Sequence, residues 1–447
     1  MSMFLYGMLT LVFTLFIFIK PRVAFYLVLG SLMAFFEPLT QVSLLNVGNA
    51  NVYGSDLMMV SLSIYLMQRF LRQKLSLYPA SVRWASIFFL WGILSIIRGI
   101  PYYGYRAIGE ARWYVIMPLL CYYFVLLNFN NKQQIREIMK VGLDLLIVTL
   151  VVRIVAFYIL GGRQSEWWPF DPEDPRSEFR FIGATTNLLV AWALILLLLF
   201  YVFGKLRKSH FMVYILFGLL LASIIIPQTR SVWISTATGV LILILFVGFH
   251  FTRRGIPLQG TLFLASVVFL ILVFSPLIVS FIGEKLLDSI IWSTSFLQNP
   301  TSDPTGSWRL LGWQQELEKA MQQPFLGQGL GGYSEWFDGQ KWQQVAVHNG
   351  YIMHFSKFGI LGLTLIFMML VFWYKEIAKY IRLEKDGYYK LLAFGFQICI
   401  LMDLVFAFFY EFTVFFWILI AICTALVRGH QHERVLDKIH VSAHYEC

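Results

Sequence analysis

The sequence predicts an all-α fold, a polytopic transmembrane helical bundle of about 12–13 spans with one long outward loop that contains short amphipathic helices. Hydrophobic residues make up 58% of the 447 residues and charged residues only 13%, a composition that excludes an ordinary soluble protein. Apolar segments repeatedly reach the roughly 20 residues that a helix needs to cross a bilayer. The 42 Phe, 22 Tyr and 14 Trp residues suit a lipid-facing surface with aromatic side chains near its interfaces.

The apolar segments are separated mostly by short polar connections. They form a single integral-membrane domain over 1–447, with the long outward loop at 282–349 and a cytoplasmic tail at 428–447. The predicted spans are 3–19, 23–38, 56–71, 83–98, 113–128, 139–160, 182–203, 210–227, 231–250, 259–281, 350–374, 389–409 and 411–427.

The formal net charge of +10 is distributed in a way that argues against nucleic-acid binding. Lys and Arg cluster in every second connection, which is the pattern that the positive-inside rule produces. This rule places the C-terminus in the cytoplasm and, with thirteen spans, the N-terminus outside. The first span lacks a basic n-region and a small-residue cleavage site, so we expect it to be retained. The 4 Cys residues are scattered and suggest neither a disulfide framework nor a metal site.

The long outward loop contains one segment with a helical pattern, at 308–321. Ser307 is a candidate N-cap, and Pro324 with Gly327 should end the helix. We expect this helix to lie at the outer membrane surface, where it would cover a groove for a lipid. Its apolar side chains recur at helical spacing at Leu310, Trp313, Leu317 and Met321.

His348 is the one histidine of 8 that falls in the outward loop, directly before Asn349 and a long apolar segment. A neutral imidazole is well suited to remove a proton near neutral pH, because its ordinary pKa is about 6.5. The alternative is a capping or interfacial histidine with no chemical role. His348 is therefore a candidate general base at a boundary between water and lipid.

Three arginines lie where lipid head groups or their phosphates would be: Arg180 at a span entrance, Arg230 in a tight turn, and Arg309 at the start of the predicted loop helix. Guanidinium groups match phosphate oxygens in a bidentate manner, so a diphosphate clamp is one interpretation. The other is that these arginines reach out to head groups without a specific ligand.

Other polar features favour structural interpretations. Arg153 and Asp403 lie within predicted spans and are costly there unless paired, so we expect a structural pair. The glycines at 327–332 match GxGxxG but follow a helix instead of a strand, so we expect a flexible turn that re-enters the membrane. The acidic segment 171–174 is more typical of a solvated loop face than of a divalent-ion site, and no metal site is predicted.

Over roughly 180–375 the sequence resembles the O-antigen ligase/polymerase superfamily of bacterial integral-membrane glycosyltransferases. The resemblance rests on four ordered blocks: Arg180 with Gly183 and Asn187; Gln228-Thr229-Arg230-Ser231; Arg309 with Trp313 and Pro324-Phe325-Leu326-Gly327-Gln328-Gly329; and His348-Asn349 with Gly359 and Gly362. The order of these blocks, the topology and the long outward loop make their combination more specific than any single block.

The resemblance implies a metal-independent, inverting transfer of glycan from an undecaprenyl diphosphate carrier on the outer face of the inner membrane, without a cofactor. His348 would match the catalytic histidine of the family. The donor diphosphate would be held by Arg180, Arg230 and Arg309, with Asn187 and Asn349 in supporting positions.

The implied acceptor distinguishes the alternatives. A surface-polysaccharide polymerase joins one lipid-linked repeat unit to another, whereas an O-antigen ligase moves the glycan to lipid A core; we favour the polymerase. Chain-length regulators and flippases are the expected protein partners. A polysaccharide flippase stays open as a different class, although transporters often show repeat symmetry that this sequence lacks.

Overall fold

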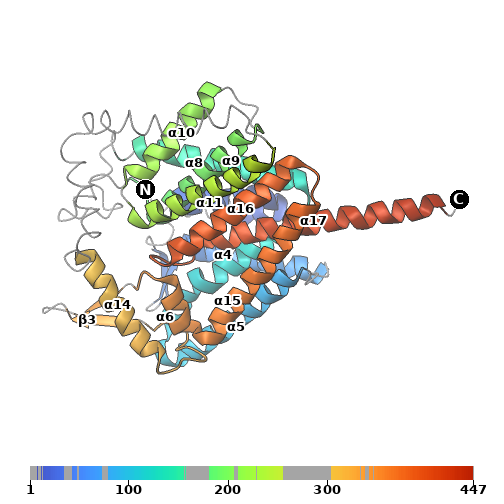
Figure 1. Ribbon diagram of the computed structural model, residues 1–447. Helices are drawn as coiled ribbons and strands as arrows, with labels where there is room; N and C mark the ends of the chain where they lie inside the picture. Colours follow the sequence, from blue (N-terminus) through green and yellow to red (C-terminus); the bar gives the residue numbers. More distant parts are fainter. Residues whose placement is uncertain are drawn as a thin grey trace, which may run out of the picture.

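The computed structural model consists almost entirely of α-helices over the residues that it describes, which confirms the predicted all-α class (Figure 1). The helices are packed as a bundle, and the last of them, α17 (Val414–Tyr445), projects far beyond it. The described residues are 14–34, 43–47, 50–72, 79–155, 181–205, 210–227, 229–254, 304–332, 334–337, 342–345 and 347–445, with 8, 12 and 157.

Most predicted spans correspond to a helix. The predicted span 259–281 lies outside the described residues, as does most of 3–19. Besides α17, the helices are α2 (Pro21–Ala34), α4 (Gly54–Arg72), α5 (Ala80–Tyr103), α6 (Tyr105–Ala111), the π-helix η1 (Arg112–Ile116), α7 (Met117–Asn128), α8 (Lys132–Ile154), α9 (Ala184–Val202), α10 (His210–Ile225), α11 (Arg230–Arg254), α14 (Pro304–Ala320), α15 (Gly350–Leu383) and α16 (Gly387–Ala407).

Five helical segments in the described part of the chain are each long and apolar enough to cross a membrane. Shorter apolar helices accompany them over parts of α2, α10, α11 and α17. These findings confirm a polytopic helical membrane protein. The five segments are Ala80–Tyr103, Tyr105–Asn128, Ala184–Val202, Gly350–Leu383 and Gly387–Ala407.

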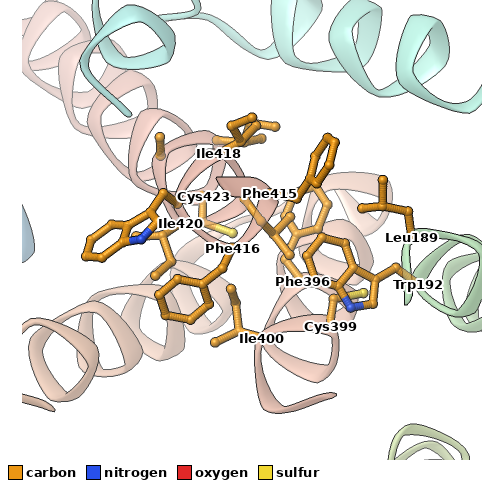
Figure 2. Packing of buried hydrophobic residues seen from close by; sticks show 14 of the residues in the cluster. Leu189, Trp192, Phe396, Cys399, Ile400, Phe415, Phe416, Ile418, Ile420 and Cys423 are labelled. Atoms are coloured by element: carbon orange, nitrogen blue, oxygen red, sulfur yellow. The ribbon is translucent and has the colours of Figure 1, made fainter. Parts of the chain in front are cut away.

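The core of the bundle lies where helices far apart in the chain meet. Helix α5 packs on α15, α7 on α17, and α11 on α16. Figure 2 shows buried side chains of α9, α16 and α17 in contact, with the free thiols of Cys399 and Cys423 among aromatic and aliphatic neighbours. Lipid tails are as apolar as these side chains, so close van der Waals packing is what favours helix association here.

In the described part of the chain, two short antiparallel hairpins interrupt the helical pattern. Strands β1 (Ser43–Val47) and β2 (Ala50–Tyr53) pair before α4, and β3 (Ser334–Phe337) pairs with β4 (Trp342–Val345) between α14 and α15. From the sequence we predict only short helices in the long loop. The aromatic and β-branched side chains of β3 and β4 favour strands, which explains the difference.

Helix α14 starts earlier than predicted. It begins at Pro304 and ends at Ala320, so Ser307 lies inside its first turn and the predicted N-cap is wrong. Proline is favoured in the first turn of a helix because the N–H that it lacks has no intrahelical acceptor there. The end of the helix agrees with the predicted stop before Pro324.

Helix α15 is broken at Gly359, whose φ of 69° and ψ of −174° are not helical. The glycine-rich loop that follows α14 fills the break. The N–H of Gln328 donates to the carbonyl of Ser356 at 2.8 Å, and the N–H of Ile360 donates to the carbonyl of Pro324 at 2.8 Å. The loop thus satisfies backbone groups that the break leaves without helical partners.

Charged side chains fix the same loop from its other side. Arg98 donates through Nη2 to the carbonyl of Gly327 at 2.5 Å. Glu110 accepts from the N–H of Gly331 at 2.6 Å and forms a salt bridge with the buried Lys357 at 3.1 Å. The predicted flexible turn is therefore wrong: the glycines allow close backbone contact with α5, α6 and α15.

We expect Gly359→Ala to destabilise the protein by about 1–3 kcal/mol, because a β-carbon there would clash with the carbonyl of Phe325 at a positive φ. The matched control is Gly142→Ala in α8, where a β-carbon meets nothing within 4 Å. That change should be neutral or stabilising by up to about 1 kcal/mol. Thermal unfolding in detergent measures both, and equal midpoints for the two variants would contradict this account of the break.

Candidate active site

Three segments meet at one end of the bundle, which we call the α14 end: helix α14, residues 347–349, and the connection 408–413 between α16 and α17. Trp313 of α14 donates from its indole Nε1 to the carbonyl of Val347 at 2.7 Å. The same indole packs edge-on against Phe408, with ring centroids 5.5 Å apart. These contacts hold α14 against both of the other segments.

His348 lies at the centre of this meeting point. Its φ of 41° makes it the one non-glycine residue with a positive φ among the described residues. Its side chain is partly open to solvent, and its ring lies 5.4 Å from the ring of Tyr410. Desolvation by the surrounding protein, and secondarily the charge of Arg309, lower the pKa of His348 from 6.5 to about 4. His348 is therefore neutral at pH 7 and able to accept a proton.

Arg309 approaches the other part of this cluster from α14. Its guanidinium carbon lies 5.5 Å from the centre of the Tyr410 ring, a cation–π arrangement. The Nε of Arg309 is buried and has no hydrogen-bond partner in the described part of the chain. An anion beside this group would provide the missing acceptor. We call His348, Arg309 and Tyr410 the histidine–arginine site.

Asn349, predicted as a supporting residue, has a structural role as the N-cap of α15. Its side-chain Oδ1 accepts from the backbone N–H groups of Tyr351 and Ile352, both at 3.1 Å. Such a cap satisfies helix N–H groups that have no other acceptor and is worth about 1 kcal/mol. By fixing the start of α15, Asn349 also fixes the backbone that presents His348.

Arg230 is the first residue of α11, which packs antiparallel on α16. Gly239 of α11 faces Met402, and Phe246 stacks on Phe394 with ring centroids 3.7 Å apart. Continuing this register back to Arg230, with a rise of about 1.5 Å per residue, reaches the level of the connection 408–413. Arg230 thus lies at the α14 end, at the height of the histidine–arginine site.

Asn187 lies in the first turn of α9. It is fully buried, and neither polar atom of its side chain has a hydrogen-bond partner among the described residues. No hydrogen bond joins Asn187 to His348 among the described residues. Arg180, the remaining predicted diphosphate ligand, lies outside the described residues.

The predicted pair of Asp403 and Arg153 does not form among the described salt bridges. The carboxylate of the fully buried Asp403 accepts a hydrogen bond from the hydroxyl of Thr413 at 3.3 Å. Asp403 belongs to α16 and Thr413 to the connection after it, so this bond fixes the connection that carries Tyr410. Arg153 lies near the end of α8, where it is also largely buried.

Two residues of the 408–413 connection escaped sequence analysis. Tyr410 contacts both His348 and Arg309, and Glu411 accepts a hydrogen bond from the hydroxyl of Tyr114 at 2.5 Å. The available signal was an isolated carboxylate between two apolar spans, which is costly unless it is paired or lies at a polar site. The predicted spans 389–409 and 411–427 left almost no connection there.

In the described part of the chain, no group of three or more His, Cys, Asp or Glu side chains is arranged to hold a metal ion. The acidic segment 171–174 lies outside the described residues.

The fold and this site define a polytopic helical membrane protein with a neutral histidine and an arginine at one end of its bundle. Residues 215–367 match the family model described as O-Antigen ligase. This match confirms the resemblance to the O-antigen ligase/polymerase superfamily over this segment. The matched segment includes Arg230, Arg309 and His348 and ends within α15. A comparison with curated proteins found no match.

Proposed function

We propose that this chain is a glycosyltransferase that joins an undecaprenyl-diphosphate-linked oligosaccharide to a glycan acceptor, as a polymerase of a surface polysaccharide. The observation that carries the proposal is the position of His348 and Arg309 against one aromatic ring, Tyr410. A proton acceptor and an anion-binding group are thereby adjacent in a membrane bundle. Two of the three residues fall inside the segment that matches the O-antigen ligase family.

In the proposed reaction His348 takes the proton of the acceptor hydroxyl. The hydroxyl oxygen forms a bond to the anomeric carbon of the donor sugar as the bond from that carbon to the diphosphate breaks. The electron pair of the broken bond leaves with the diphosphate, whose growing charge is stabilised by Arg309 and Arg230. Attack opposite the leaving group inverts the anomeric centre.

The interaction between Arg309 and His348 links donor binding to proton transfer. The Arg309 charge contributes to the low pKa of His348, about 4, in the protein without donor. A donor diphosphate beside Arg309 would offset this charge and raise the pKa of His348 toward its ordinary value. A base of higher pKa accepts a proton more readily, so His348 would become a stronger base when the donor is bound.

The proposal includes a placement of the site in the membrane, which we infer from the positive-inside rule. The clusters of Lys and Arg in alternate connections orient the bundle with its C-terminus in the cytoplasm. This orientation puts the α14 end on the outer face of the inner membrane. A donor carried on a lipid would reach the site there without leaving the bilayer.

A ligase that transfers the glycan to lipid A core is the second candidate, because the matching family model is described as O-Antigen ligase. The same histidine and arginines would serve this reaction, since only the acceptor differs. A flippase is less well supported, because the candidate residues gather at one end of the bundle.

The products of the purified chain distinguish these candidates. Protein in detergent is incubated with a synthetic undecaprenyl-diphosphate repeat unit, with and without lipid A core. A ladder of longer lipid-linked glycans without lipid A core would support the polymerase, and transfer only to lipid A core would support the ligase. An unchanged donor under both conditions would contradict the enzyme assignment.

We expect Tyr410→Leu to lower the transfer rate about fivefold, the effect of losing one cation–π contact, because the ring positions both His348 and Arg309. Tyr410→Phe keeps the ring and should retain nearly the full rate. A merely structural role would lower the yield of folded protein without changing the rate per folded molecule. Equal rates per folded molecule in Tyr410→Leu and Tyr410→Phe would contradict the positioning role.

A further inference from the structure

A cavity of about 400 Å³ opens at the end of the bundle opposite α14. It lies where α2 begins and where α4 and α7 end, and the positive-inside rule predicts this end to be cytoplasmic. Among the described residues, three cationic side chains line it, Lys20, Arg22 and Arg69, and no carboxylate does. Its volume is in the range of pockets that take small ligands, about 300–1,000 Å³.

A buried asparagine holds the two arginines at the cavity. Asn128, only 4% exposed, accepts from Arg22 Nε through its backbone carbonyl at 3.1 Å. Its side-chain Oδ1 accepts from Arg69 Nη2 at 3.5 Å and from the hydroxyl of Tyr65 at 2.6 Å. Tyr65 in turn accepts from Arg69 Nε at 3.1 Å. The arginines are therefore positioned by the protein and do not simply extend into the lipid head groups.

These cations keep unused hydrogen-bond donors. A guanidinium carries five N–H donors, and Arg22 uses only its Nε in the contacts above. The described salt bridges include none of Lys20, Arg22 and Arg69. Glu137 of α8 acts electrostatically on Tyr26, as Arg22 does, but it forms no salt bridge with Arg22 among the described residues.

We propose that this cavity binds a phosphate group at the membrane surface, either the head group of an anionic phospholipid or free phosphate. Basic residues that only obey the positive-inside rule need neither a cavity nor a buried asparagine to orient them. Two half-buried guanidinium groups and an ammonium group around one cavity match the oxygens of a phosphate. The site is distinct from the histidine–arginine site, because α7 runs from η1 at the α14 end to Asn128.

The test measures ligand binding to the full chain, so it does not depend on glycosyl transfer. Native mass spectrometry of the protein with phosphatidylglycerol or phosphatidylcholine gives the retained lipid. A thermal-unfolding titration with inorganic phosphate gives the affinity for the free anion. The variants are Arg22→Gln, Arg69→Gln and Lys20→Gln, and the matched control is Arg382→Gln, an exposed arginine at the end of α15.

If the cavity holds a lipid head group, phosphatidylglycerol is retained in preference to phosphatidylcholine. Each arginine variant then weakens its retention about fivefold, and Arg382→Gln does not. If it holds free phosphate, the phosphate-induced rise in unfolding midpoint is lost in the same variants. Lys20→Gln alters an exposed side chain and keeps the test valid should an arginine variant fail to fold. The proposal would be overturned if every cavity variant bound each of the two ligands as well as the wild type does.

Discussion

Replacing His348 by Asn will lower the glycosyl-transfer rate by about 10²–10⁴-fold, the usual contribution of a general base. Asparagine removes the proton acceptor but tolerates the positive φ of 41° at this position, which alanine does not. The backbone that presents the side chain, and the N-cap at Asn349, should therefore stay in place. Initial rates of purified wild type and His348→Asn, with donor binding measured separately, test this expectation.

Two controls separate a lost base from a lost fold. His440→Asn changes a histidine near the C-terminal end of α17, the helix that projects beyond the bundle (Figure 1), and it should leave the rate unchanged. The unfolding midpoint of His348→Asn should match that of wild type. A His348→Asn protein that is folded, binds donor and transfers glycan at the wild-type rate would rule out His348 as the base.

Arg309→Gln will lower the transfer rate by about 10²–10³-fold, because it removes a charge that stabilises the leaving diphosphate. Arg309→Lys keeps a positive charge but not the planar fork that binds two oxygens at once. We therefore expect Arg309→Lys to have an intermediate rate. Donor-concentration series for the three proteins measure this order, and a lysine variant as slow as the glutamine variant would show that charge alone is insufficient.

The pH dependence of Arg309→Gln provides an independent readout. In the free wild-type protein the pKa of His348 is about 4, so kcat/KM should fall only near pH 4 on the acid side. Removing the Arg309 charge removes the second cause of this low pKa. The pKa of His348 then rises, and the acid limb moves to higher pH while desolvation still holds it below 6.5. An acid limb that stays in place or moves to lower pH would contradict the coupling between the two residues.

The fold was predictable because hydropathy reports directly on the bilayer. An apolar segment of about 20 residues has few alternatives to a membrane-spanning helix, since unpaired backbone groups are costly in lipid. The predictions were wrong for segments between spans, where the bilayer does not constrain the backbone in this way. The strands β3 and β4, the start of α14 at Pro304 and the fixed glycine loop all lie between spans.

The site was predictable only in part. His348 and Arg309 were identified from their positions in the sequence, and a family resemblance supported them. Their contact with Tyr410 depends on packing between segments far apart in the chain. Nothing in the sequence distinguishes Tyr410 from the other tyrosines, of which there are 22 in all. The hydrogen bond from Thr413 to Asp403 was missed for the same reason: composition shows that a buried charge needs a partner but does not show which one.

The anomeric configuration of the new glycosidic bond tests the central claim most directly, namely that His348 activates the acceptor for direct displacement of the diphosphate. The product formed by the purified chain from a donor of known configuration is analysed by NMR spectroscopy. Our account predicts inversion, because a single displacement occurs opposite the leaving group. Retention would contradict it, since retention requires two successive displacements through a covalent glycosyl intermediate on the protein.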